Sequence, residues 1–121
     1  MPLSDLTQSA VIQVTSKALD AAGLRHLAIM SNIANAGNPL HVAQRVDFEE
    51  ALRSALAGAD QSGHGSAMNG VLARVVPDRR PVAIDQEIAA LARNALHYQA
   101  LLKTLNAELE LLGLAANDGR R

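Results

Sequence analysis

The most regular pattern of hydrophobic positions lies near the C-terminal end of the chain. Apolar residues recur there at alternating spacings of four and three, at Ile84, Ile88, Leu91, Ala95, Tyr98, Leu102, Leu105, Leu109 and Leu112. Such an unbroken heptad pattern is typical of a helix in a coiled coil and predicts a helix over about 84–114. We call these nine positions the seam. Because an exposed apolar stripe of this length favours aggregation, we expect a partner for it, either the N-terminal helix or further copies of the chain.

A second apolar pattern predicts a long N-terminal helix over about 4–36. Spacings of seven and four connect its apolar positions, Val11, Ala18, Ala22, Ile29 and Ile33. Asn35, Gly37 and Pro39 then end the pattern. Asn and Gly accept the left-handed conformation that closes helix C-termini, and Pro forces the preceding residue out of the helical region.

The hydrophobic positions in the middle of the chain are spaced less regularly. We expect residues 40–46 to be extended and a short helix to run over about 48–57, with Asp47 and Glu50 as a capping box and Gly58 as its stop. Residues 58–70, rich in Gly and Ser, predict a flexible linker. Residues 71–83 predict an extended arm or one short strand. The whole chain, 1–121, is then a single, mainly α-helical, discontinuous domain whose terminal helices pair as a coiled-coil core.

Composition narrows the class of function. Alanine and leucine supply most of the hydrophobic residues, the formal net charge is −1, and the chain has no cysteine. Thiolate chemistry, disulfides and zinc–thiolate sites are therefore excluded, and no basic patch points to nucleic acid. We see neither a cleavable signal peptide nor a run of about 20 apolar residues for membrane insertion. The histidines lack metal-ligand spacing, at 26, 41, 64 and 97. We expect no cofactor, no metal and no enzymatic activity.

Three blocks of sequence resemble the flagellar rod and hook axial family, specifically its small proximal-rod proteins. The first ends in the motif Asn32-Ile33-Ala34-Asn35, with Pro39 in the following turn. The second contains Asp47 and Phe48, and the third is the C-terminal stretch from Tyr98 to Leu112. The resemblance covers roughly 1–57 and 80–121. It departs from the family at Leu40 and His41, where family members usually carry Gly and Tyr.

The resemblance implies a structural subunit of the bacterial flagellar basal body, in the proximal rod of the axial drive shaft, required for flagellar motility. Family members pair their terminal helices and stack with other rod proteins and with copies of themselves. The resemblance also implies unfolded export through the flagellar type III apparatus without a cleaved signal. Assembly would then follow in the periplasm, next to the ring into which that apparatus opens. The alternative is a soluble helical adaptor that self-associates through the seam.

Overall fold

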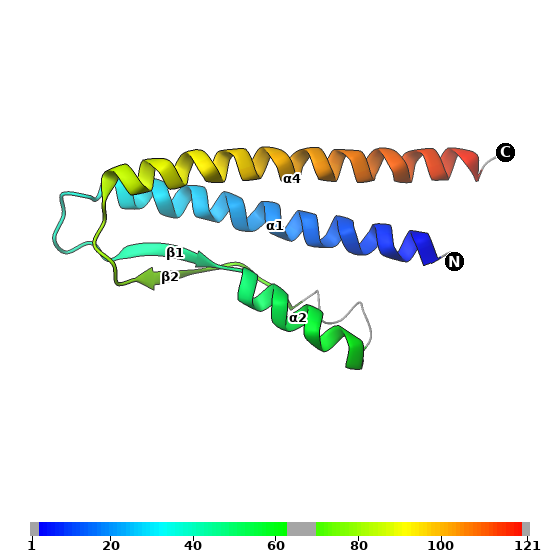
Figure 1. The fold of residues 1–121 in the computed structure, drawn as a ribbon, viewed down its shortest axis with the longest axis horizontal. Helices are drawn as coiled ribbons and strands as arrows, with labels where there is room; N and C mark the ends of the chain where they lie inside the picture. Colours follow the sequence, from blue (N-terminus) through cyan, green and yellow to red (C-terminus); the bar gives the residue numbers. More distant parts are fainter. Residues whose placement is uncertain (1–2, 63–69, 120–121) are drawn as a thin grey trace.

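The computed structural model describes residues 3–62 and 70–119, and the side chains of residues 10–58 and 70–119. The elements follow in the order α1 (Leu3–Ala34), β1 (Ala43–Asp47), α2 (Glu49–Ser62), β2 (Arg74–Asp78) and α4 (Ile84–Asp118). The two long helices α1 and α4 lie side by side and run in opposite directions (Figure 1). The strands and α2 lie on the other side of α1 from α4. The expected mainly helical fold with packed terminal helices is confirmed.

The helices differ from the predicted ones at their ends. α1 stops at Ala34, two residues early, because Asn35–Gly37 form a turn. Gly58 was expected to end the short helix, but α2 continues to Ser62, and α4 extends four residues past its predicted end, to Asp118. A glycine inside a helix costs about 1 kcal/mol relative to alanine, and that is too little to end a helix by itself. The predicted linker is therefore helical at 58–62, while residues 63–69 lie outside the described part of the chain.

The middle of the chain contains a two-stranded antiparallel sheet, in which Ala43 pairs with Asp78 and Asp47 with Arg74. The 71–83 segment therefore includes a strand, a choice that the sequence left open. Pro77 lies opposite Gln44 in the register. The backbone N–H and C=O of Gln44 bond to a side chain of α1, so this pair is one of the non-hydrogen-bonded pairs of the ladder. A proline fits at that position because its missing N–H would point away from β1.

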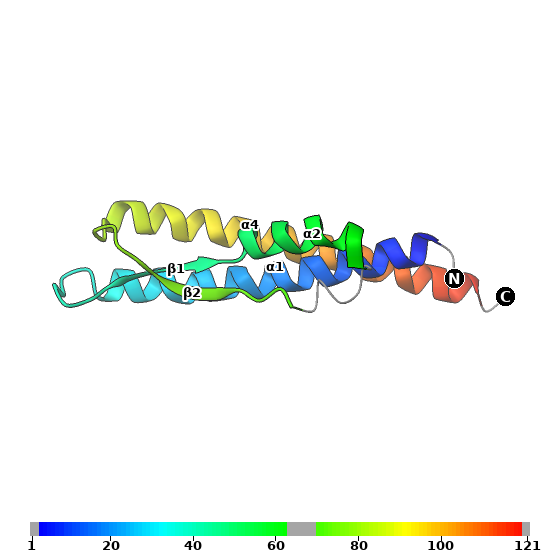
Figure 2. The ribbon, with the colours of Figure 1, turned by 90° about the horizontal axis from the view of Figure 1, so that it is seen from below.

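The sheet arm, which comprises β1, α2 and β2, lies along α1 (Figure 2), and the hydrophobic core lies between them. Phe48 is its largest member and is only 4% exposed. It packs with Ala21 of α1 and Val71, and smaller contacts surround this cluster, from Val14, Ala18, Leu52, Ala55 and Ala73. Alanine dominates the α1 side, which lets the arm approach the helix backbone closely. Phe48 is therefore the largest apolar anchor of the arm on α1.

The predicted capping box does not form. The carbonyl of Phe48 accepts the first hydrogen bond of α2, from the Leu52 N–H at 2.9 Å, so the N-cap position is Phe48. Asp47 belongs to β1, and its Oδ1 accepts from Arg45 Nη1 at 2.6 Å. Glu50 accepts from Arg53 at 3.1 Å instead of reaching back. The prediction placed the helix start one residue early, and that shift moves Asp47 out of capping range.

Within the described residues, no helix has both the length and the apolar character that crossing a bilayer demands. This holds for α1 and α4 as well as for the short α2.

Candidate functional site

Asn32, the first asparagine of the motif, joins three elements of the fold. It is 2% exposed. Its Nδ2 donates to the carbonyl of Gln44 in β1 at 2.9 Å and to Glu87 Oε2 in α4 at 3.2 Å. Its Oδ1 accepts from the N–H of Gln44 at 2.8 Å and lies 3.2 Å from His41 Nε2. Every donor and acceptor of this carboxamide thus has a partner, which removes the cost of burying a polar group.

Asn32 and Arg25 together cover the outer edge of β1. Arg25 lies seven residues before Asn32, two turns along the same face of α1. Its Nη2 donates to the carbonyl of Val46 at 3.2 Å. The backbone N–H and C=O of Gln44 and the C=O of Val46, which point away from β2, therefore bond to side chains of α1. A free strand edge invites pairing with other chains, and on β1 these bonds reduce that risk.

Arg25 also ties α1 to the start of α2. Its Nη2 lies 2.5 Å from Glu49 Oε2. Partial burial alone would raise the pKa of Glu49, but the hydrogen bond and the positive charge of Arg25 outweigh it, and the pKa of Glu49 is lowered below its usual value. Glu49 is accordingly charged at neutral pH, and the arm is held at both ends of β1 by α1.

The remaining motif residues build the turn that follows α1. The Nδ2 of Asn35 donates to the carbonyl of Ser31 at 2.8 Å. The Oδ1 of Asn38 accepts from the N–H of Leu40 at 3.0 Å, and the Asn38 carbonyl accepts from the N–H of His41 at 3.1 Å. Pro39 thus occupies the second position of a hydrogen-bonded turn, where its fixed φ is suitable. Ile33 is half-buried and Ala34 is exposed at the helix end.

Leu40 and His41 also fit this turn. Leu40 follows Pro39, in a position that accepts a non-glycine residue when the turn is type I, and its side chain is 89% exposed. His41 is half-buried with its Nε2 beside Asn32. Since Asn32 Oδ1 is an acceptor, His41 Nε2 carries the proton in this contact. The turn therefore forms without a glycine, and His41 contributes to the Asn32 junction.

Most of the seam does not face α1. Its large side chains are between 39% and 53% exposed, at Ile84, Ile88, Tyr98, Leu102, Leu109 and Leu112. Leu91 and Leu105 are half-buried, and Ala95 is exposed. One residue before seam positions, less exposed residues of α4 recur every seven residues, at Glu87, Asn94, Leu101 and Glu108. Two of them, Glu87 and Asn94, are hydrogen-bonded to α1. The chain therefore leaves an apolar stripe open along nearly the whole length of α4.

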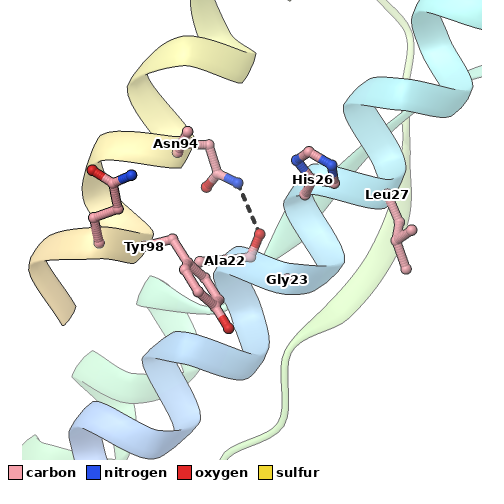
Figure 3. A pocket seen from close by; sticks show the side chains of 8 residues that line it. Ala22, Gly23, His26, Leu27, Asn94 and Tyr98 are labelled. Carbon is pink, nitrogen blue, oxygen red and sulfur yellow. Dashed lines mark hydrogen bonds between the residues drawn. The ribbon is translucent and has the colours of Figure 1, made fainter. Parts of the chain in front are cut away.

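A groove between α1 and α4 borders this stripe. It has a volume of about 430 Å³. The small residues Ala22, Gly23 and Ala95 contribute to it, and Leu27 and Tyr98 also line it (Figure 3). A Cβ placed on Gly23 would meet nothing within 4 Å, so this glycine is not required for close approach of the two helices. Groove and seam form one continuous apolar surface.

Sequence reasoning missed three residues that the structure brings into use. Gln44 gave no signal, and Arg25 lies in the first block of resemblance without a role of its own, because the role of each depends on which strand lies beside α1. Asn94 gave a weak signal in the sequence, because it is a polar amide between the apolar residues Leu91 and Leu101 of the last helix. It is 7% exposed and donates from Nδ2 to the carbonyl of Ala22 at 2.8 Å. Among residues 3–62 and 70–119, no group of three or more His, Cys, Asp or Glu side chains is placed to hold a metal ion.

The described residues thus form a pair of long helices with a largely covered strand edge and an open apolar stripe on α4. The chain is similar to a Bacillus subtilis (strain 168) protein, flagellar basal body rod protein FlgB. The two are 27% identical over 125 residues, which span 93% of this chain and 97% of that protein. No protein-family model matches the chain. The similarity supports the flagellar rod protein family and favours a structural, non-enzymatic protein.

Proposed function

We propose that this chain is a structural subunit of the proximal part of the flagellar basal-body rod, and that it assembles by helix packing through the seam. The observation that carries the proposal is the open apolar stripe on α4, on a chain that is similar to FlgB over nearly its full length. The stripe is too long to be a chance feature of a monomer surface. Large exposed apolar patches mark sites of protein–protein contact.

The neighbours in this proposal are other flagellar rod proteins and further copies of the chain. An axial structure grows by head-to-tail contacts that do not close into a ring, and such contacts need different surfaces on each subunit. α4 offers them, because large apolar side chains outside the seam are also exposed, at Leu96, Leu111 and Leu114. A helix that is apolar on several sides is normally surrounded by protein.

The proposal also includes the route to the assembly. The chain is exported unfolded through the flagellar type III apparatus, without a cleaved signal, and joins the rod in the periplasm beside the ring into which that apparatus opens. A chain that buries much of its apolar surface against neighbours can gain part of its order at the moment of assembly. The alanine-rich core supports this, since the structure describes no large side chain that is buried to below 2% exposure.

Replacing Leu102 with Asp is expected to abolish assembly and motility while leaving the monomer fold intact. Leu102 belongs to the seam and is 41% exposed, so the charge reaches water in the monomer. In the assembly the carboxylate would be buried without a partner, which costs several kcal/mol. The measurement is swimming in soft agar, together with the amount of the chain in purified basal bodies.

The matched control is Asn106→Asp, which places the same charge one turn further along α4, at an exposed position outside the seam. This variant should swim normally. Normal motility of the Leu102→Asp strain would exclude the seam as an assembly surface. If the wild-type chain forms a small closed oligomer in solution and is absent from basal bodies, the helical-adaptor function replaces the rod function.

A further inference from the structure

Around Asn94, the contact between α1 and α4 is made of small residues. α1 presents Ala22 and Gly23 there, and α4 presents Ala95. Such small side chains form shallow ridges, and shallow ridges allow one helix to slide along the other at little cost in packing. Along this stretch, the register therefore needs another interaction.

Asn94 provides such an interaction. Its Nδ2 donates to the backbone carbonyl of Ala22, a residue 72 positions away in the sequence. Figure 3 shows the carboxamide of Asn94 pointing from α4 toward the carbonyl of Ala22, with Gly23 next to it. The carbonyl is accessible because Ala22 and Gly23 carry no bulky side chain to cover it. A buried amide that loses its acceptor costs about 1–3 kcal/mol, so a shifted register is disfavoured by that amount.

A second polar tie between the helices lies on the same side of α4 as Asn94, nearer the start of that helix. Glu87 is seven residues before Asn94 on α4, and its Oε2 accepts from Asn32 of α1. Asn32 is also bonded to β1. The two ties hold α4 to α1 at points two helical turns apart, and one of them holds the sheet arm at the same time.

We propose that Asn94 determines the register of the middle of the α1–α4 pair, beyond the Asn32–Glu87 tie at its end, and that it thereby determines which surface the subunit presents to its neighbours. The register sets which α1 residues stand beside the seam. In the observed register, Gly23 and Leu27 border the groove next to Ala95 and Tyr98. A slide of one turn, about 5.4 Å, would replace them and change the shape of that surface. The effect on assembly rests on the proposed function, whereas the effect on register does not.

Replacing Asn94 with Leu separates register from stability. The carbonyl of Ala22 lies within α1 and keeps its helical hydrogen bond, so the substitution leaves no orphaned polar group. The new side chain adds apolar burial, and the melting temperature should be equal to or higher than that of the wild type. A merely structural asparagine predicts the same melting behaviour but no change in register, so a direct measurement of register is decisive.

The measurement is a distance distribution between two spin labels, attached to cysteines introduced by His26→Cys and His97→Cys. Both positions are exposed, and the chain has no other cysteine. The full-length chain is used in a buffer with trimethylamine oxide, which strengthens the folded state. Without further substitution we expect one narrow distance. With Asn94→Leu we expect a broadened distribution, or a second distance displaced by up to about 5 Å, one helical turn.

Asn106→Leu, the same exchange at an exposed position of α4, is the matched control and should keep the single distance. One narrow distance in the Asn94→Leu chain, or a broad one in the unsubstituted chain, would overturn the proposal. Incorporation into basal bodies is measured in parallel, and Asn94→Leu should reduce it despite the unimpaired stability. If spin labels report the shift but even the wild type is missing from basal bodies, the register role stands and the rod function falls.

Discussion

Replacing Phe48 with Ala is expected to destabilise the chain by about 3–5 kcal/mol, the usual cost of deleting a buried aromatic side chain. Phe48 is 4% exposed and fills the space between α1, the start of α2 and Val71. The surrounding residues are mainly alanine and valine, so they cannot reach in to fill the cavity. The total free energy of unfolding of a small domain is only about 5–15 kcal/mol. The sheet arm should therefore detach from α1 in much of the population.

The measurement is urea unfolding followed by circular dichroism at 222 nm, in the presence of trimethylamine oxide. The matched control is Leu56→Ala, which removes a large side chain from the same helix at a position that is 52% exposed. It should shift the midpoint only slightly. Equal midpoints for the Phe48→Ala and Leu56→Ala chains would show that Phe48 is not the anchor of the arm.

Substitution of Asn32 should have the second largest effect, because three elements meet at its side chain. Asn32→Ala leaves the N–H and C=O of Gln44 without their partners, at a cost of about 1–3 kcal/mol for each unsatisfied group. Asn32→Asp should be worse at neutral pH. It replaces the amide donor with a carboxylate that faces both the carbonyl of Gln44 and the carboxylate of Glu87.

Hydrogen exchange at the amide of Gln44 reports this junction directly. In the wild type the amide donates to Asn32 Oδ1 at 2.8 Å and should be protected. In the Asn32→Ala chain we expect exchange to rise by about tenfold or more, since each 1.4 kcal/mol is a factor of ten. Asn106→Asp, at an exposed site, should leave it unchanged. Unaltered protection of Gln44 in both Asn32 variants would contradict the junction.

The heptad pattern located the last helix correctly but did not indicate which face packs on α1. The stripe richest in large apolar residues is the seam, and the natural expectation was that the nearest helix would cover it. Leu91 and Leu105 of the seam are half-buried, and so are Glu87 and Glu108 beside it, while Asn94 is buried. Asn32 and Ala22 supply hydrogen-bond partners for Glu87 and Asn94. Periodicity measures apolar character alone, so it does not reveal the polar pairs that tie α4 to α1.

The pairing of the two strands likewise could not be predicted from the sequence, because it is a non-local feature. Extended segments before Phe48 and after Val71 were predictable from composition. Their pairing was not, because the register of β1 and β2 depends on contacts that neither segment encodes alone. The motif asparagine was recognised as a helix end by resemblance, yet its role is to bind a strand that begins eleven residues later. A single sequence contains no signal for such a partner.

The most direct test of the rod function is quantitative mass spectrometry of purified hook–basal bodies from the bacterium that carries this chain. The proposed function predicts that the chain is present in intact particles at a few copies each, and that the Leu102→Asp chain is missing from them. Intact, functional basal bodies that lack the wild-type chain would contradict it.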